Sequence, residues 1–370
     1  MSFTTDGGAG GAESAKSPAI AGVVPSDPAA ARAELPLTLL CAGYHLRLLN
    51  AVRARFDGHA ERVVLPILLW LATLLCAPNS EVACAAAVVL EGLGLETRPT
   101  PRSYSLREIE QATGLPRETL RRTAGQLQGF GWIERDGKDQ LTVTPRFTDY
   151  LWADGGSARL EDFRWTAARL RELSDPACAG ICVSAADALA AMRACRGDEL
   201  FRSNRWAAPR ALAPPLAAAA VVYLCGHNLR HLLALAPAFD GDLLQAVLLG
   251  ELGHRNVTAL APSAAKRDDD LATVMKLEQP DASLWDDPQR ACNVLSLANC
   301  LNVPYETTRR KLAQLGKRGL VLRDERGLYW VQPSAQDHFR EFNREQRADM
   351  LATAARIEAL APAPDHSGVS

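Results

Sequence analysis

The sequence is poor in aromatic residues and has no excess of either charge. Aromatic side chains make up 6% of the chain, and 41 Lys and Arg residues stand against 43 Asp and Glu residues. Because the charge is so nearly balanced, nucleic-acid binding would require local basic patches rather than a positive field over the whole molecule. Alanine is abundant and alternating runs of Val, Ile and Tyr are scarce. This composition predicts a mainly helical fold with strands only in short hairpins.

No Cys-x-x-Cys pair occurs, although the chain holds nine cysteines. An odd number of cysteines scattered among apolar residues argues against a disulfide framework. We therefore expect buried free thiols in a reducing cytoplasm. These residues are Cys41, Cys76, Cys84, Cys178, Cys182, Cys195, Cys225, Cys292 and Cys300.

A hydrophobic run long enough to cross a bilayer is also missing. The most apolar stretch, 63–78 (VVLPILLWLATLLCAP), contains Pro66 and is shorter than the roughly 20 residues that a membrane helix needs. We expect a buried core helix there and no membrane association. Residues 1–33 are rich in Gly, Ala, Ser and Pro without an apolar core, so we expect a disordered segment rather than a signal peptide or anchor.

Known catalytic and metal-binding patterns are absent from the sequence. Neither Gly-x-Ser-x-Gly nor His-Glu-x-x-His is present, and no paired-carboxylate setting stands out. Cys225, His227, His231 and His254 are close in sequence, but on a helix only His227 and His231 would share a face. We expect no metal, no cofactor and no enzymatic activity.

The chain contains an internal repeat. Residues 115–127 (LPRETLRRTAGQL) match 303–315 (VPYETTRRKLAQL) at seven of thirteen positions with an offset of 188, and identities continue without gaps to Pro145 and Pro333. Upstream, residues 46–58 match 229–241 at an offset of 183, including a Phe-Asp-Gly sequence in each. Two matches in the same order indicate duplication of one unit.

The repeat sets the expected domain organisation. We expect a disordered segment 1–33, a first unit 34–151 with its motif at 104–146, a helical connector 152–213, a second unit 214–336 with its motif at 290–334, a C-terminal helix 337–360 and a disordered tail 361–370.

The first motif predicts two helices separated by a tight turn. Residues 106–112 form a short amphipathic pattern, Gly114 suits a turn with positive φ, and Pro116 opens a second helix over 117–128. Strands are expected at 132–135 and 140–144 around the Asp136-Gly137 turn. The residues expected to face inward are Leu106, Ile109, Leu120, Ala124 and Leu127.

The second motif repeats this order. The expected helices cover 295–301 and 304–315, and the expected strands cover 320–323 and 328–331. Asn302 replaces the turn glycine, and asparagine tolerates left-handed backbone angles well enough to keep the turn.

This helix, turn, helix and hairpin order resembles bacterial winged helix-turn-helix regulators of the MarR, ArsR and IclR type. The resemblance covers about 45 residues in each half. Both copies depart from the usual sequence pattern of these regulators by placing Pro116 and Pro304 where the family has Ser or Thr. The resemblance implies a fold of tandem winged helix-turn-helix domains, with the additional helices forming a pseudo-dimer, and a sequence-specific transcription regulator.

In such proteins the second helix enters the major groove, and the hairpin wing reaches the backbone or the adjacent minor groove. Arginine can grip guanine edges or clamp phosphates. The candidate DNA-binding residues are Arg117, Glu118, Arg121, Arg122, Arg135 and Lys138 in the first copy and Tyr305, Glu306, Arg309, Arg310, Lys311, Arg323 and Arg326 in the second, with Lys317 and Arg318 extending the second patch.

The expected partner is double-stranded DNA carrying an imperfect palindrome, because the copies differ at Arg117 against Tyr305 and at Thr123 against Lys311. The helices around 46–55 and 229–235 should pack together within the pseudo-dimer. RNA polymerase, another regulator and a second copy of the chain are further candidate partners, and the nucleoid in the cytoplasm is the expected location.

Three alternatives remain open at this level. Glu118 with Arg122, and Glu306 with Arg310, have the spacing of surface ion pairs. The protein could instead be a replication initiator or partition-type protein, some of which carry two winged units. Winged domains also serve as protein-interaction adaptors.

Overall fold

Helices make up most of the structure, a computed structural model that describes residues 28–56, 58–95, 97, 103–136, 140–153, 156–174, 212, 214–258 and 292–361. Within these residues the strands form two small two-stranded antiparallel sheets. The prediction of a mainly helical fold with strands in short hairpins is confirmed.

The first half of the chain contains α1 (Pro28–Arg55), the 3-10 helix η1 (Ala60–Val63), α2 (Val64–Leu74), α3 (Ser80–Gly92), α4 (Leu106–Thr113), α5 (Arg117–Gly129), β1 (Ile133–Arg135), β2 (Leu141–Val143), α6 (Pro145–Ala153) and α7 (Gly156–Ser174).

The second half contains α9 (Pro214–Ala238), α10 (Leu243–Thr258), α14 (Val294–Leu301), α15 (Tyr305–Lys317), β3 (Val321–Arg323), β4 (Tyr329–Val331), α16 (Pro333–His338) and α17 (Arg340–Ala359). In each half a long helix ends at the Phe-Asp-Gly sequence, where Gly58 and Gly241 have φ of 85° and 79°. The positive φ explains the glycine at both positions.

Each sheet is a short hairpin. Ile133 pairs with Val143 across β1 and β2, and Val321 pairs with Val331 across β3 and β4. A single bridge extends each hairpin, from Tyr104 to Leu141 and from Cys292 to Tyr329. The chain segment that precedes the first helix of each motif is thereby fixed to the hairpin.

The part of the apolar stretch 63–78 that runs to Ala72 is buried at the centre of the first half, whereas Thr73, Cys76 and Pro78 are exposed. Leu65, Leu68 and Leu71 in α2 are 0% exposed, and Trp70 is 1% exposed. Burial on all sides explains why this helix is apolar all round. Among the described helices, none is by itself long and apolar enough to cross a membrane, although the bent pair Leu216–Ala238 and Leu243–Asn256 passes by length and composition.

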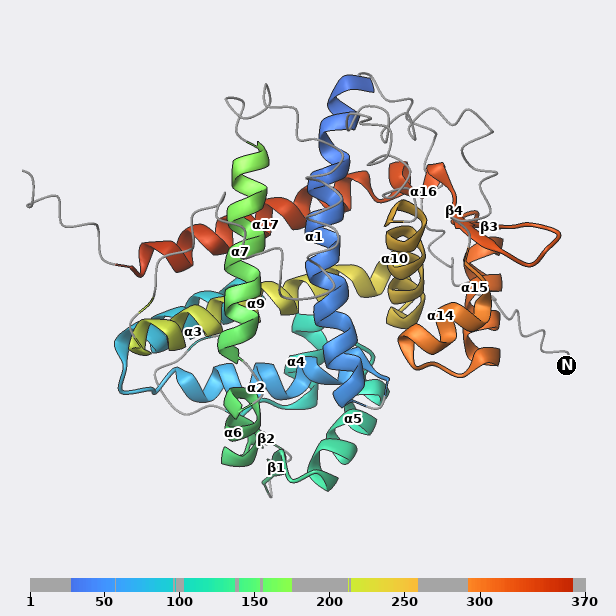
Figure 1. Ribbon diagram of the computed structural model, residues 1–370. Coiled ribbons are helices and arrows are strands. Elements are labelled where there is room, and N and C mark those ends of the chain that lie inside the picture. Colours follow the sequence, from blue (N-terminus) through green and yellow to red (C-terminus); the bar gives the residue numbers. More distant parts are fainter. Residues whose placement is uncertain are drawn as a thin grey trace, which may run out of the picture.

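The helices at the centre of the molecule join the two halves through matching contacts. Helix α1 packs on α7, α10 and α17, and α9 packs on α17, α2 and α7. Two contacts between halves are therefore matched by one with the halves exchanged: α1 on α10 by α9 on α2, and α1 on α17 by α9 on α7. The contact of α3 with α9 has no such counterpart among the described residues. Figure 1 shows α1 and α7 running up the view while α9 and α17 run across it.

Side chains of α1 and α9 meet at this junction in two reciprocal pairs. The Tyr44 hydroxyl donates to Asn228 Oδ1 at 3.0 Å, and His45 Nε2 lies 3.1 Å from His227 Nε2. At the offset of 183, Tyr44 corresponds to His227 and His45 corresponds to Asn228. The two helices thus contact just before the stretches 46–55 and 229–235 that were expected to pack.

A matching ion pair ties the last helix of each half to the first. Arg47 donates to both carboxylate oxygens of Asp162, at 3.0 and 2.6 Å. Arg230 does the same to Asp349, at 2.9 and 3.1 Å. Bidentate geometry of this kind fixes orientation as well as contact, so α7 on α1 and α17 on α9 are held in the same way.

Close packing of α3 on α9 depends on Gly226. A Cβ atom at Gly226 would lie 2.6 and 2.8 Å from the two methyl groups of Val89, a β-branched residue with little rotameric freedom. We expect Gly226→Ala to destabilise the protein by about 1–3 kcal/mol, because overpacking forces helices apart. The free energy of unfolding from urea titration measures this effect.

The matched control is Gly125→Ala in α5, where a Cβ would meet nothing within 4 Å. This substitution should stabilise the helix by roughly 0.5–1 kcal/mol, since alanine loses less backbone entropy than glycine. Equal effects of the two substitutions would contradict the proposed close contact.

Several boundaries and cysteines differ from expectation. Helix α1 begins at Pro28, inside the segment 1–33 that was expected to be disordered, while residues 1–27, most of the connector 152–213 and residues 362–370 lie outside the described residues.

Cys41, Cys225 and Cys292 are buried and free as expected, but Cys76, Cys84 and Cys300 are exposed. On α3, Val82, Ala85 and Val89 occupy the inner face, which leaves Cys84 outside. Cys178, Cys182 and Cys195 lie outside the described residues.

Candidate nucleic-acid interface

In the first half, α4 and α5 are joined as the sequence predicted. Ser105 and Glu108 form a reciprocal capping box at the start of α4, and Gly114 ends it with a φ of 68°. Pro116 occupies the N-cap of α5 without a side-chain cap, so the helix begins at Arg117. The apolar face consists of Leu120, Ala124 and Leu127 as expected, together with Thr123.

In the second half, Asn302 takes the place of the turn glycine. It adopts a left-handed conformation with φ of 49° and ψ of 52°, which confirms the expected turn. Asn293 caps α14 by accepting a hydrogen bond from the Ser296 amide. Pro304 is again the N-cap and not the first helical residue, so α15 begins at Tyr305. Thr308 and Leu312 point inward at the positions of Leu120 and Ala124.

Both helices expose an arginine pair. Arg121 and Arg122 on α5, and Arg309 and Arg310 on α15, are solvent-exposed. Figure 1 shows α5 along the lower edge of the molecule and α15 along its right edge. Neither arginine pair is covered by the helices that join the two halves.

The ion pairs at these surfaces differ from those that the sequence suggested. Glu118 pairs with Arg121 at 2.6 Å and Glu306 pairs with Arg309 at 2.6 Å, each three residues apart. The spacing to Arg122 and Arg310 is one residue longer, and in the described part of the chain those two arginines form no ion pair. The bidentate geometry possible at the shorter spacing explains the choice of partner.

Hydrogen bonds from Arg121 lower the pKa of the Glu118 carboxyl, and hydrogen bonds from Arg309 do the same at Glu306. Both carboxylates are thus ionised at neutral pH, and each holds one arginine of its pair. Since exposed pairs of this kind contribute little net stability, a phosphate could displace the carboxylate. Arg122 and Arg310 need no such exchange.

The remaining candidates occupy different surroundings. Arg117 and Tyr305 stand exposed at the first position of their helices, with Tyr305 51% exposed. Lys311 is half-buried and forms an ion pair with Asp242 just before α10. The Arg318 guanidinium donates to the Ala238 carbonyl and lies 5.1 Å from the centre of the Phe239 ring. Lys311 and Arg318 therefore also attach α15 to the helices behind it.

Each hairpin carries exposed basic residues beside its helix. Arg135 is the last residue of β1, and Arg323 is the last residue of β3 with its guanidinium 5.8 Å from the Tyr329 ring centre. Arg326 is exposed in the turn that Gly327 closes with a φ of 82°. Lys138, the candidate at the first hairpin turn, lies outside the described residues.

The sequence did not indicate how each hairpin is anchored. In the first half an aromatic cluster holds it: the Trp132 ring centre lies 5.4 Å from that of Phe56, 5.6 Å from Phe147 and 4.5 Å from Tyr150. In the second half the side-chain oxygen Oδ1 of the buried Asn256 accepts a hydrogen bond from the backbone N–H of Val331 at 3.0 Å. The position of Trp132 as the first residue of the predicted strand 132–135 was the only available signal for this anchoring.

The histidines and the cysteine that were close in sequence separate in the structure. Cys225 faces a pocket described below, while His227 and His231 lie at the junction of the halves. Within the described residues, no group of three or more His, Cys, Asp or Glu side chains has the arrangement of a metal site.

Comparison with known proteins adds no relative. No family model, no curated protein and no solved structure matches the chain. Functional assignment therefore depends on the residues of the site itself.

Proposed function

We propose that the protein is a sequence-specific regulator of transcription that binds double-stranded DNA through two winged helix-turn-helix units, one in each half. One observation carries the proposal: two helices with the same Arg-Arg pair on their exposed face each follow a left-handed turn residue and precede a basic hairpin. The winged fold by itself would not indicate DNA, because such domains also bind proteins.

In this proposal α5 and α15 lie in the major groove. A helix fits that groove, and an arginine fork can reach the O6 and N7 atoms of guanine. Arg122 and Arg310 contact bases or phosphates directly, while Arg121 and Arg309 exchange a carboxylate for a phosphate oxygen. Glu118 and Glu306 hold these two arginines in ion pairs until DNA arrives.

The reciprocal contacts between halves support an internal pseudo-dimer. Two-fold interfaces are isologous, so that a contact between two positions occurs a second time with the partners exchanged. The pairs Tyr44 with Asn228 and His227 with His45 follow this rule. A pseudo-dimer would present its two reading helices to half-sites about 34 Å apart. The first helix has Arg117 where the second has Tyr305, so the two half-sites would differ in sequence.

A protein-interaction role has one specific observation in its favour. Tyr305 and Leu322 of the second unit are 51% and 49% exposed. Exposed aromatic and aliphatic side chains are typical of protein-binding surfaces. The second unit could therefore contact a protein such as RNA polymerase while the first reads DNA.

Salt dependence of DNA binding tests the proposal. If about six phosphates are contacted, affinity for duplex DNA should fall by orders of magnitude between low and moderate salt. Sites recovered by selection from random duplexes should show two related half-sites, and occupancy mapping in cells should place them at promoters. Repeated sites near an origin would favour an initiator, and affinity for no duplex would refute the DNA-binding role.

A further inference from the structure

Helices α7 and α17 are equivalent elements of the two halves. The ion pairs of Asp162 with Arg47 and of Asp349 with Arg230 set an offset of 187 between these helices. The buried positions follow the same offset, and each is at most 3% exposed in both copies. These positions are Phe163 with Met350, Thr166 with Thr353, Ala167 with Ala354 and Leu170 with Ile357. Any residue of one helix can therefore be compared with its counterpart in the other.

One ion pair joins a residue to its own counterpart. Arg171 of α7 donates from Nη1 to both carboxylate oxygens of Glu358 in α17, at 3.0 and 2.7 Å, and the two residues are 187 positions apart. In a two-fold arrangement, a position that touches its own equivalent lies beside the axis. Two first halves paired in this way would bring two Arg171 side chains together, and two second halves would bring two Glu358 side chains together. Either self-pair would thus place like charges where the mixed pair has opposite ones.

A hydrogen bond between α17 and α1 has an apolar counterpart. Arg347 donates from Nη1 to Thr38 Oγ1 at 2.7 Å. The corresponding positions are Leu160 at the offset of 187 and Val221 at the offset of 183, which are 6% and 3% exposed. A pair of second halves would set Arg347 against Val221, and a pair of first halves would set Thr38 against Leu160. Each self-pair would therefore lose this hydrogen bond.

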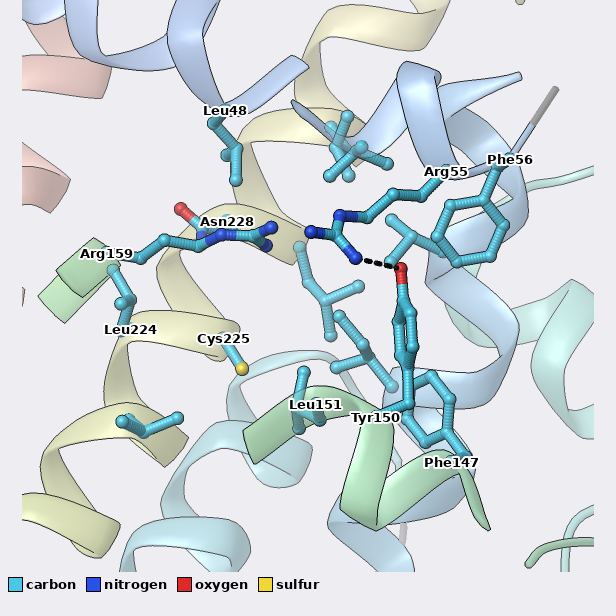
Figure 2. A pocket seen from close by; sticks show the side chains of 16 residues that line it. Leu48, Arg55, Phe56, Phe147, Tyr150, Leu151, Arg159, Leu224, Cys225 and Asn228 are labelled. Atoms are coloured by element: carbon cyan, nitrogen blue, oxygen red, sulfur yellow. Dashed lines mark hydrogen bonds between the residues drawn. The ribbon is translucent and has the colours of Figure 1, made fainter. Parts of the chain in front are cut away.

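The fit between helices also differs at the reciprocal contacts of α1 with α10 and of α9 with α2. A Cβ atom at Gly250 of α10 would lie 2.6 Å from Leu46 Cδ2 of α1, so the missing side chain lets α1 approach. At the offset of 183 the counterparts are Ile67 and Leu229, which line the pocket shown in Figure 2. A pair of first halves would have no glycine to receive Leu46.

We propose that the two halves are exclusive partners: the surface of α1, α2, α3 and α7 binds α9, α10 and α17 of a second half and rejects a copy of itself. Such specificity combines contacts that fit the correct partner with like charges that oppose the wrong one. Arg171 and Glu358 select by charge, Arg347 selects by hydrogen bonding and Gly250 selects by shape. Halves in separate chains would then pair one to one, and a second copy of the chain would not dock here.

Cleavage of the folded full chain tests the proposal. A protease site is inserted between Ser174 and Pro214 of unlabelled and isotopically labelled protein, and both are cut after purification. The two preparations are mixed, unfolded in urea and refolded by dilution beside the uncut chain. Native mass spectrometry should then find pairs of one first and one second half with all label combinations, and self-pairs at about a tenth of the total or fewer.

Charge variants of the cut protein test the selecting ion pair. Glu358→Arg brings two guanidinium groups together and should weaken the pairing of halves at least about fivefold at low salt, with a smaller effect at high salt. Arg171→Glu combined with Glu358→Arg restores opposite charges and should return the affinity to within about twofold of the wild type. The control is Glu345→Arg, the same change at an exposed position of α17, which should pair as the wild type does.

Circular dichroism of the uncut variants would show that each is folded. The proposal is overturned if the wild-type halves separate after cutting, or if self-pairs are as abundant as mixed pairs. It is also overturned if Glu358→Arg and Glu345→Arg pair equally well, or if the charge swap fails to restore affinity. No DNA is present in these measurements, so their outcome does not depend on the proposed function.

Discussion

The double substitution Arg122→Ala with Arg310→Ala is expected to abolish most of the specific DNA affinity. These arginines are exposed at matching positions of α5 and α15 and are not held by the neighbouring glutamates. Each lost base contact should cost roughly 1–3 kcal/mol, or about 5- to 150-fold in affinity. Fluorescence anisotropy on a selected duplex, repeated over a range of salt concentrations, measures both the affinity and the number of phosphates contacted.

A control comes from Arg356→Ala in the last turn of α17, where the arginine is exposed and lies outside both motifs. It removes one positive charge, against two in the double variant, from a surface outside α5 and α15, and it should leave affinity nearly unchanged. If the double variant and this control bound the selected duplex equally well, α5 and α15 would not be the reading helices.

The single substitutions should have unequal effects. The two helices differ at their first residue and in the ion pair that Lys311 forms with Asp242. We therefore expect Arg122→Ala and Arg310→Ala to alter protection at different half-sites of an imperfect palindrome. Equal loss at both half-sites from either variant would contradict independent reading by the two units.

The second large effect concerns pH. Unfolding free energy should fall steeply as the pH drops below about 6.5, the ordinary pKa of histidine. Burial lowers the pKa of His45 and His227 and lowers that of His231 to about 3. The junction of the halves is thus stable only while these three rings remain neutral.

The arrangement of the junction explains why the rings resist protonation. The Asp349 carboxylate can only accept a hydrogen bond, so the neutral His227 ring donates one to it from Nδ1. The Nε2 atom of His227 then accepts a hydrogen bond from Nε2 of His45. The ring of His231 stacks on that of His45 with 3.5 Å between centres, and its buried Nε2 atom has no hydrogen-bond partner among the described residues. A proton on His45 would place a charge beside His227 and His231.

The surrounding groups do not remove this cost. Arg230 shares the Asp349 carboxylate with His227, and Arg47 further disfavours a charge on His45. Cys41 lies 3.7 Å from His45 Nδ1, and burial raises the pKa of its thiol to about 12, so it stays neutral. Gln346 is the neutral partner of His231.

The direction of the pH effect follows from proton binding. Below about 6.5 the unfolded chain takes up protons at these histidines while the folded chain does not, so the free energy of unfolding decreases by about 1.4 kcal/mol per pH unit for each ring. The decrease continues down to the folded pKa of each histidine, which for His231 is about 3. Urea titrations at intervals between neutral and acidic pH measure this slope.

Two variants separate the cluster from other acid effects. His45→Asn with His227→Tyr places at this contact the same two residue types as the reciprocal Tyr44 and Asn228 pair, and it should reduce the slope to the contribution of His231. His59→Asn, which removes an exposed histidine outside the junction that pairs with Glu61, is the control. A double variant with the wild-type slope would rule out His45 and His227 as its source.

Much of the local structure followed from short-range patterns. Gly114 and Asn302 indicated turns that the structure places in the left-handed region. The spacing of Leu120, Ala124 and Leu127 predicted the buried face of α5, and this left its arginines outside. These features depend on backbone sterics and helical periodicity within a few residues, which is why they can be read from sequence.

Several side-chain contacts were missed or misassigned. Glu118 was expected to pair with Arg122 and pairs with Arg121, because two spacings are possible on a helix and side-chain geometry selects between them. Lys311 was grouped with the DNA contacts, and its ion pair with Asp242 depends on how α15 packs against α10. No periodicity reports such a contact.

By itself, the sequence determined the helical composition, the two repeated motifs and the arginines on their exposed faces, because each depends on neighbouring residues along the chain. Only the tertiary structure decided that His45 meets His227 and that Arg171 meets Glu358. Those arrangements join residues separated by a hundred positions or more, and the packing of whole helices brings them together.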